Sequence, residues 1–476
     1  MAGCLSEILF NPHSAILKRT LYFLNVTVAH GQSSPTIIST GIDFSFAVCN
    51  NNTTWAWGKN FSGQLGFGNN NDSINYPIPN SITNIISIEG GGDHSYVLKN
   101  DSTVWTWGSN GWGQLGNGST VTVSYIPVQA SSLNGITAIA GGGYGHCLAL
   151  KNDGTVWAWG RNIYGELGNG SYTDSNIPVQ VNTLTGIIAI AVGNYHSLAL
   201  KNDSTVWTWG YNGFGQLGNG TNTTSNIPVQ VTGLSGVLTI SAHSYGHSLA
   251  LKKDSTVWAW GYNASGELGN GTNTDSNVPV QVSLLTGVTT IAGGGDQSYA
   301  IKNDSTFWAW GFNGNGNFGN GNNANSNIPL QVNSLTGIIA ISSLGHCLAL
   351  KNDGTVWAWG ANQFGELGNG TFTYSNVPIQ VNGLCNSLSV TQNLLKQNIS
   401  ISPNPFSSQT VLQTDNFLLN ATLTVDNCFG QTVKQIKNIN GQTVLLSRDN
   451  LASGLYFVRL TEDNKTFATE KLLIVD

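Results

Sequence analysis

Residues 187–231 read IIAIAVGNYHSLALKNDSTVWTWGYNGFGQLGNGTNTTSNIPVQV, and this stretch decides the fold. Four short apolar or alternating runs cover residues 187–192, 197–200, 205–209 and 227–231. Glycine, Asn-Asp and Asn-Gly turn signals separate these runs, as expected for short strands joined by tight turns. In the third run a period of two places Trp207 and Trp209 on one face of a strand, where they would fill the gap between neighbouring sheets.

The same pattern recurs along most of the chain. The spacing Trp-x-Trp-Gly begins at seven positions, and these copies account for fourteen of the 15 tryptophans. The positions are Trp55, Trp105, Trp157, Trp207, Trp258, Trp308 and Trp357. Four strands per roughly 50 residues is the size of one propeller blade. The chain is therefore predicted to be all-β, with a seven-bladed β-propeller over residues 36–385.

The composition excludes two classes of partner. Lys plus Arg number 18 and Asp plus Glu number 24 in 476 residues, and residues 36–385 hold 9 of the basic and 16 of the acidic side chains. A phosphate-binding surface needs clustered Lys and Arg, so we expect no nucleic-acid partner. No stretch approaches the roughly 20 apolar residues of a membrane helix, so we expect no membrane-spanning segment.

The motifs inside each copy resemble a known family. Residues 146–170 show the order Gly-x-x-His-Ser-x-Ala-Leu, Asp-Gly-x-Val-Trp-x-Trp-Gly and Asn-x-x-Gly-Gln-Leu-Gly-x-Gly in approximate form. These motifs are similar to the repeat of the regulator of chromosome condensation family. The resemblance implies a propeller whose ring closes between the first and last repeats. It implies no single activity, because a fold this versatile leaves function to its loops.

The periodicity stops after Cys385. Residues 386–398 are rich in Gln, Asn and Ser and indicate a linker. Seven short alternating runs then predict a small C-terminal β-sandwich over residues 399–476. The runs are 399–402, 410–413, 421–425, 432–437, 443–446, 455–460 and 470–475. The motifs at 402–405 (SPNP), 430–433 (GQTV), 451–456 (LASGLY) and 471–473 (KLL) resemble the C-terminal sorting domain of type IX secretion cargo. This resemblance implies a Bacteroidetes-type bacterium and contact with the secretion machinery through residues 399–476.

The first residues have the pattern of a secretory signal. Lys18 and Arg19 precede an apolar run at 21–29, and Ala29-His30-Gly31 fits the small-x-small pattern of a signal-peptidase site. Residues 1–31 are therefore interpreted as a secretion signal region, the alternative being a disordered N-terminal tail of a cytoplasmic protein. We expect the protein to be secreted or displayed on the outer-membrane surface of a bacterium.

The recurring polar residues have structural interpretations. Five histidines occupy one repeat position, but propeller blades spread equivalent atoms around a ring, whereas metal ligands converge within about 2.0–2.2 Å of one ion. We expect each of them to bond the backbone: His94, His146, His196, His247 and His346. One aspartate in each of repeats two to seven falls in an Asn-Asp-Gly/Ser type of turn and is expected to cap its own backbone: Asp101, Asp153, Asp203, Asp254, Asp304 and Asp353. We predict no metal, cofactor or catalytic residue, and one carboxylate in loops such as 270–277 is too few for calcium.

The six cysteines allow few pairings. Cys147 and Cys347 occupy the same position in non-adjacent repeats, beyond the roughly 7 Å Cα separation that a disulfide tolerates, so they are interpreted as small buried side chains. Cys49 with Cys385 is the only pair whose repeat positions allow closure.

Variation between the copies indicates a site. Aromatic residues recur at two variable loop positions on one rim, and rigid aromatic side chains are enriched in binding hot spots. The candidate partner-binding residues are Trp112, Tyr164, Tyr211, Phe214, Tyr262, Phe312 and Phe364. The alternative is that these rings only pack over neighbouring blades. The leading hypothesis is a secreted or cell-surface binding module for a protein or glycan; the alternatives are a structural adhesin or spacer, and a secreted hydrolase.

Overall fold

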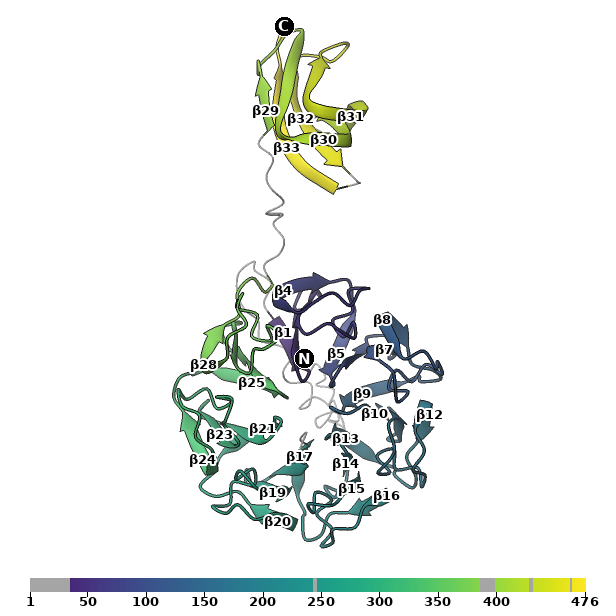
Figure 1. Cartoon of the computed structure of the whole chain (residues 1–476), viewed down its shortest axis with the longest axis vertical. Coiled ribbons are helices and arrows are strands. Elements are labelled where there is room, and N and C mark those ends of the chain that lie inside the picture. Colours follow the sequence, from purple (N-terminus) through teal and green to yellow (C-terminus); the bar gives the residue numbers. More distant parts are fainter. Residues whose placement is uncertain (1–34, 243–245, 386–398, 428–430, 463–464) are drawn as a thin grey trace, which may run out of the picture. The chain divides into compact units, whose positions relative to one another are not determined.

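The computed structural model describes residues 35–242, 246–385, 399–427, 431–462 and 465–476. The chain forms two compact units, Met1–Asn386 and Ser387–Asp476. In the described residues of the first unit, seven four-stranded sheets stand around a ring (Figure 1). The predicted seven-bladed propeller is confirmed. The predicted signal region 1–31 and linker 386–398 lie outside the described residues.

Each blade is an antiparallel meander whose four strands follow one another in the sequence. Blades one to four contain β1 (Pro35–Thr40), β2 (Phe44–Cys49), β3 (Thr54–Gly58), β4 (Ile74–Asn80), β5 (Ile85–Gly90), β6 (His94–Lys99), β7 (Val104–Ser109), β8 (Val123–Gln129), β9 (Ile136–Gly141), β10 (His146–Lys151), β11 (Val156–Gly160), β12 (Ser175–Gln180), β13 (Ile187–Val192), β14 (His196–Lys201), β15 (Val206–Gly210) and β16 (Ser225–Gln230). Blades five to seven contain β17 (Val237–Ala242), β18 (His247–Lys252), β19 (Val257–Gly261), β20 (Ser276–Gln281), β21 (Val288–Gly293), β22 (Gln297–Lys302), β23 (Phe307–Gly311), β24 (Ser326–Val332), β25 (Ile338–Ser343), β26 (His346–Lys351), β27 (Val356–Gly360) and β28 (Ser375–Gln380).

The first strand of each blade lies nearest the centre of the ring and the fourth lies at its circumference (Figure 1). Every fourth strand contains a proline, such as Pro228 in β16. Proline has no N–H to donate, so it suits an edge strand and opposes pairing with another chain.

The hydrophobic core lies between the blades. Leu198, Leu200 and Val206 of blade four form one buried cluster with Ala250 and Trp260 of blade five. Comparable clusters join each of the other pairs of adjacent blades, including blade seven with blade one. Each blade buries its apolar faces only against its neighbours, so the ring is stable as a unit.

Only the second tryptophan of each pair is fully buried. Trp209 is 0% exposed, and its Nε1 donates to the carbonyl of Glu166 in the preceding blade at 2.7 Å. Trp207 is half-buried and donates to Thr205 Oγ1 in its own blade at 3.3 Å. The predicted alternation of side chains along the strand is correct. Trp207, however, lies at the hairpin end of its strand, where the blade meets solvent.

The recurring histidines join neighbouring blades through serine. His146 Nε2 lies 3.1 Å from the Oγ of Ser197 in the next blade, and Ser197 donates to the carbonyl of Glu166 at 3.0 Å. Because serine uses its proton on the carbonyl, the histidine must donate from Nε2. His196, His247 and His346 make the same contact with the next blade's serine. At Nε2 of these four histidines the partner is a side chain of the next blade and not the backbone that was predicted, whereas His94 Nε2 has no partner among the described residues.

Burial keeps these imidazoles neutral. Burial lowers the pKa of His196 to about 3. Burial, together with the nearby His196 and Arg161, lowers the pKa of His146 to about 3. The described residues contain no group of three or more His, Cys, Asp or Glu side chains that could hold a metal ion.

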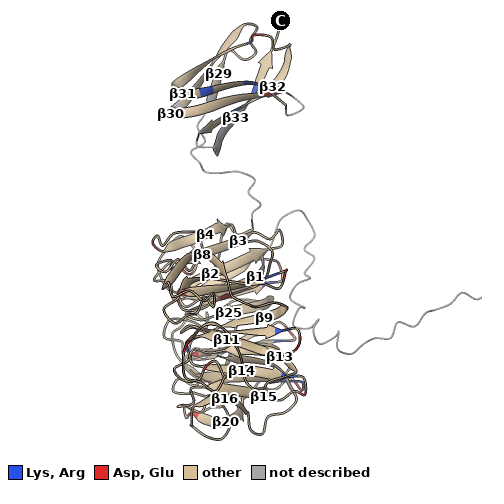
Figure 2. Ribbon diagram, turned by 90° about the vertical axis from the view of Figure 1, so that its right-hand side faces the viewer, with Lys and Arg blue, Asp and Glu red and all other residues tan. Residues whose placement is uncertain are grey.

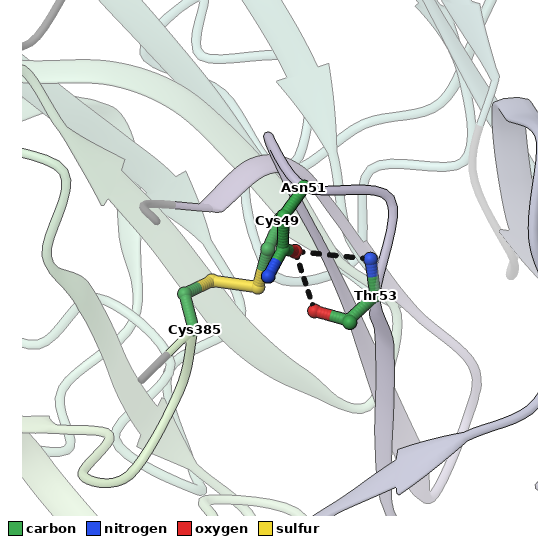
Figure 3. Close-up of a disulfide and its surroundings, with 4 residues drawn as sticks. All are labelled: Cys49, Asn51, Thr53 and Cys385. Carbon is green, nitrogen blue, oxygen red and sulfur yellow. Dashed lines mark hydrogen bonds between the residues drawn. A yellow bond between two sulfur atoms is a disulfide. The ribbon is translucent and has the colours of Figure 1, made fainter. Parts of the chain in front are cut away.

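A disulfide closes the ring covalently. Cys49 at the end of β2 is bonded to Cys385 after β28, with the Cα atoms 5.6 Å apart (Figure 3). The pairing that the repeat positions allowed is confirmed. Cys147 and Cys347 are free thiols and fully buried, as predicted.

The recurring aspartates cap the turns between the second and third strands. Asp203 Oδ1 accepts hydrogen bonds from the N–H and the hydroxyl of Thr205 at 3.0 and 2.6 Å. The residue between them, Ser204, has a φ of 68°, and glycine takes this position in blades three and seven. This left-handed conformation explains why only Gly or a small polar residue follows the aspartate in these repeats.

The described part of the second unit has five strands where seven were predicted: β29 (Ile399–Ser402), β30 (Gln409–Asn427), β31 (Thr432–Ser447), β32 (Gly454–Glu462) and β33 (Lys465–Ile474). The runs at 410–413 and 421–425 belong to one long strand, β30, and those at 432–437 and 443–446 belong to β31. Irregular pairing interrupts the ladder between β30 and β31 without ending either strand. Leu412 and Leu423, from the two halves of β30, share one core.

Charged residues are sparse on the strands of the propeller (Figure 2). Among the described residues, no helix is long and apolar enough to cross a membrane.

Candidate functional site

Two kinds of loop meet at one end of the ring, which we call the loop rim. Because strands alternate in direction, the loop between the first and second strands and the loop between the third and fourth strands lie at the same end of each blade. In blade four the N–H of Tyr211 in one loop donates to the carbonyl of Tyr195 in the other at 2.8 Å. The two loops therefore form one surface.

Internal hydrogen bonds fix the backbone course of the longer loop. Asn212 Oδ1 accepts the N–H of Leu217 at 2.9 Å, and Gln216 Oε1 accepts the N–H of Phe214 at 3.0 Å. Gly215 has a φ of 83°, and a Cβ there would meet the backbone of Asn277 in the next blade at 2.5 Å. These constraints recur in most blades, which leaves the side chains at positions such as 211 and 214 free to vary on a fixed backbone.

Four of the predicted residues meet in one chain of rings across blades three to five. The ring centroids of Tyr164 and Tyr211 are 4.9 Å apart, and those of Tyr211 and Phe214 are 5.9 Å apart. Phe214 and Tyr262 follow at 5.0 Å. Edge-to-face and tilted pairs of this kind are each worth about 0.5–1.5 kcal/mol beyond the area that they bury.

Three residues that were not predicted as partner-binding complete this group. Tyr195 packs edge-on against Tyr164 at 5.4 Å and stacks on Tyr144 at 5.0 Å. The Arg161 guanidinium lies over the rings of Tyr195 and Trp112, at 4.7 and 5.6 Å from their centroids. We call these eight residues the aromatic cluster: Trp112, Tyr144, Arg161, Tyr164, Tyr195, Tyr211, Phe214 and Tyr262.

Two predicted residues belong to blades six and seven. Phe364 packs edge-on against Phe61 at 5.8 Å, with Lys59 Nζ 5.3 Å from its centroid. Phe312 lies over Gly314 in its own loop. The ring and cation–π contacts described above join five of the seven predicted residues: Trp112, Tyr164, Tyr211, Phe214 and Tyr262.

The cluster is only partly open to solvent. Trp112 is 47% exposed, whereas Tyr164, Tyr211, Phe214 and Tyr262 are half-buried. Packing between blades therefore accounts for part of their burial, as the alternative interpretation expected. Only the exposed parts of these side chains are available to contact a partner.

Sequence reasoning missed Tyr144 and Tyr195 because only one kind of loop was compared between repeats. Both tyrosines lie in the loop before the histidine strand, where other blades carry Asp43, Asp93 or Asp296. Comparing that loop as well would have found them, because both loops end at the same rim.

Aspartates lie on another part of the loop rim. Lys59 Nζ lies 3.4 Å from Asp43 and 3.0 Å from Asp93, at the junction of blades one and two. Gln64 Nε2 also donates to Asp93 Oδ1, at 3.1 Å. This bond shows how adjacent blades align on the loop rim. The Gln or Glu in the long loop of one blade, here Gln64, lies next to the aspartate of the following blade, here Asp93.

Glu267 of blade five and Asp296 of blade six occupy the same two positions as Gln64 and Asp93, and the two carboxylates lie near each other. Burial, together with the nearby Asp296 charge, raises the pKa of Glu267 to about 7, and burial raises the pKa of Asp296 to about 7. Such values suit acid–base chemistry. Glu267 is 0% exposed, however, and its Oε2 accepts the N–H of Ser265 at 2.9 Å, so it cannot reach a substrate from this position.

The motifs at 402–405 and 451–456 meet the last strand of the C-terminal unit. Asn404 donates to the carbonyl of Lys471 and accepts the N–H of Leu473, both at 2.8 Å. Arg448 donates to the carbonyl of Val475 at 3.0 Å and forms an ion pair with Asp476 at 3.0 Å. Residues far apart in the sequence thus hold the C-terminal strand in place, which explains why they occur together.

Family models match nearly the whole described chain. Residues 22–298, more than half of the chain, match the RCC1-like domain, and residues 304–350 and 353–392 match the regulator of chromosome condensation (RCC1) repeat. Residues 400–475 match the secretion system C-terminal sorting domain. The propeller is therefore a secreted module.

Curated relatives match over a limited part of their length. The chain is 31% identical over 151 residues to the Homo sapiens E3 ubiquitin-protein ligase HERC2, which is 31% of this chain and 3% of that protein. It is 30% identical over 142 residues to the Arabidopsis thaliana ultraviolet-B receptor UVR8, which is 30% of this chain and 21% of the receptor.

Solved structures share the fold. Human WBSCR16 matches with a TM-score of 0.60 and 25% identity, over 69% of this chain and 88% of that one. Prp20p of Saccharomyces cerevisiae matches with a TM-score of 0.65 and 22% identity, over 80% of this chain and 91% of that one. RCC1-like propellers usually serve as binding or regulatory modules.

Proposed function

The chain belongs to the RCC1-like domain family, and we propose that it acts outside the cell as a non-enzymatic binding module for a protein or glycan. The aromatic cluster is the proposed contact surface. The sorting domain at residues 400–475 supports this location, because it is the part of the chain that resembles secretion cargo.

The observation that carries the proposal is the aromatic cluster itself. The rings and Arg161 gather on blades two to five. Tyr, Trp and Arg dominate binding hot spots because they supply large, rigid contact area and desolvate well. The rigid loop backbone beneath them reduces the ordering cost of binding.

Two alternatives are less well supported. A hydrolase needs an acid or nucleophile within reach of a substrate, and the carboxylates Glu267 and Glu366 are buried beneath the loops. A structural adhesin or spacer would need no cluster of aromatic residues confined to one part of the loop rim.

A capture experiment tests the proposal. The full chain, the Arg161→Ala variant and a control variant, Phe372→Ala, are immobilised and exposed to host and environmental extracts. Phe372 is 51% exposed and lies outside the aromatic cluster, so it matches Trp112 in exposure without sharing its surroundings. We expect one protein or glycan to be retained by the wild type and the control and lost with Arg161→Ala. Equal retention on all three surfaces, or none on the wild type, contradicts the proposal.

A further inference from the structure

A small hollow lies beside the aromatic cluster, at the junction of blades one, two and three. Its volume is about 170 Å³, and Lys59, Asp93, Ser109, Trp112, Gln114 and Tyr144 line it. Clefts that hold drug-sized ligands measure roughly 300–1,000 Å³. The hollow therefore has room for a single ring or one side chain.

A small residue at one repeat position contributes to the hollow. The residue after Trp-Gly is long in five of the other blades (Lys59, Arg161, Tyr211, Tyr262 and Phe312) and small in blade two, which has Ser109, and in blade seven, which has Ala361. A small side chain at a position where the repeat usually carries a long one leaves space above the strand.

The hollow offers both hydrogen-bond donors and hydrogen-bond acceptors. Asp93 Oδ1 contacts Lys59 and Gln64, but its Oδ2 has no partner among the described residues. Gln114 accepts the N–H of Trp112 through Oε1 at 2.8 Å, which leaves its Nε2 to donate. The Ser109 hydroxyl can donate or accept a hydrogen bond. Such a mixture matches hydroxyl groups, which donate and accept at the same time.

The charges around the hollow are balanced. Lys59 neutralises one of the two carboxylates that it contacts, and Arg161 lies over the Trp112 ring at 5.6 Å. A second cation at Trp112 would be repelled by Arg161, and an anion would meet Asp93. A neutral ligand suits this balance better than a basic or acidic side chain.

The aromatic walls complete the site. Trp112 and Tyr144 are 47% and 43% exposed, so each presents part of a ring. The face of an aromatic ring carries partial negative charge and attracts the polarised C–H groups of a saturated ring. We propose that this hollow binds one neutral sugar ring, so that the partner of the module is a glycan. This inference rests on the proposed function and narrows it to one ligand class.

The test measures sugar binding to the full chain by saturation-transfer difference NMR. The probes are glucose, galactose, mannose and N-acetylglucosamine, with glucuronic acid and glucosamine as charged counterparts. We expect at least one neutral sugar to give a saturable signal and the charged sugars to give signals at least fivefold weaker.

Three variants locate the signal. Ser109→Tyr fills the hollow with a side chain that the repeat already accepts at 211 and 262, so the fold should be retained. Ser109→Tyr and Trp112→Ala should each lower the signal at least fivefold, while Phe372→Ala should not change it. A melting temperature is recorded for each variant to confirm folding.

The outcomes separate this inference from the proposed function. No signal from any neutral sugar, or a signal that persists in Ser109→Tyr, overturns the sugar site, even if the aromatic cluster captures a protein. A preference for glucosamine would likewise overturn it and indicate a basic side chain as the occupant. A sugar signal that depends on Ser109, together with partner capture that ignores Arg161, supports the hollow and contradicts only the wider cluster.

Discussion

The hydroxyl of Ser197 is predicted to contribute measurably to the closure of one blade interface. It lies between two buried groups, 3.1 Å from His146 Nε2 and 3.0 Å from the Glu166 carbonyl oxygen. The Ser197→Ala variant removes this hydroxyl and changes little else, because the Glu166 carbonyl keeps its bond from Trp209 Nε1 at 2.7 Å.

The expected loss of folding stability comes from the His146 N–H, which remains in the variant without an acceptor. The His146 N–H is fully buried and would lose its acceptor, and an unsatisfied buried donor costs about 1–3 kcal/mol. The unfolding entropy of a propeller of about 350 residues is roughly 0.7 kcal/mol per kelvin. The melting temperature should therefore fall by roughly 1–4 °C.

One blade interface of the wild-type chain already lacks the serine hydroxyl. At the interface of blades two and three Cys147 replaces the serine, and the Nε2 of His94 has no partner among the described residues. The Cys147→Ser variant would supply the hydroxyl, so we expect it to stabilise the propeller by about 1 kcal/mol.

Urea unfolding followed by tryptophan fluorescence measures both changes. Ser225→Ala is the control, because its hydroxyl donates only to a carbonyl two residues away on an outer strand. We expect the control to lie within about 0.5 kcal/mol of the wild type. If Ser197→Ala matches the control and Cys147→Ser destabilises, the inter-blade role of the serine hydroxyl is refuted.

Four further predictions concern the stability and routing of the chain. Trp209→Ala should cost about 3–5 kcal/mol and the half-buried Trp207→Ala clearly less, as urea unfolding would show. Cys49→Ala opens the covalent ring and should destabilise the propeller by about 2–5 kcal/mol, which a thermal melt with and without reductant measures. Glu267→Gln should stabilise by up to about 3 kcal/mol at pH 8 and much less at pH 4. The reason is that the pKa of Glu267 is raised to about 7, so its stabilising contribution is present below pH 4 and is lost as the pH rises through 7. Deletion of residues 399–476 should leave the propeller folded but retain it in the periplasm of its native host, as immunoblots of cell fractions would show.

The blades could be predicted from the sequence because their determinants are local. The Trp-x-Trp-Gly spacing, the turn aspartates and the loop glycines act within one repeat or on the next, so a single period describes them. The ring-closing pair Cys49 and Cys385 could be found for the same reason, since only repeat positions were needed.

The parts that could not be predicted depend on contacts between repeats. The bond from His146 to Ser197 joins residues 51 apart in sequence, and nothing in either residue alone distinguishes it from a bond to backbone. The joint role of Arg161, Tyr144 and Tyr195 needs two different loops to end at one rim. The length of β30 was missed because its irregular pairing around residue 418 resembles a turn in the sequence pattern.

The central claim is that the aromatic cluster is a contact surface and not only packing between blades. The most direct measurement is calorimetric titration of the captured partner against wild type, Tyr211→Ala and Phe372→Ala, with a melting temperature for each. We predict that Tyr211→Ala weakens binding by roughly thirtyfold or more, equivalent to about 2 kcal/mol, while the control binds as the wild type does. If Tyr211→Ala lowers the melting temperature and leaves the affinity unchanged, the rings serve only the packing of the blades and the claim is contradicted.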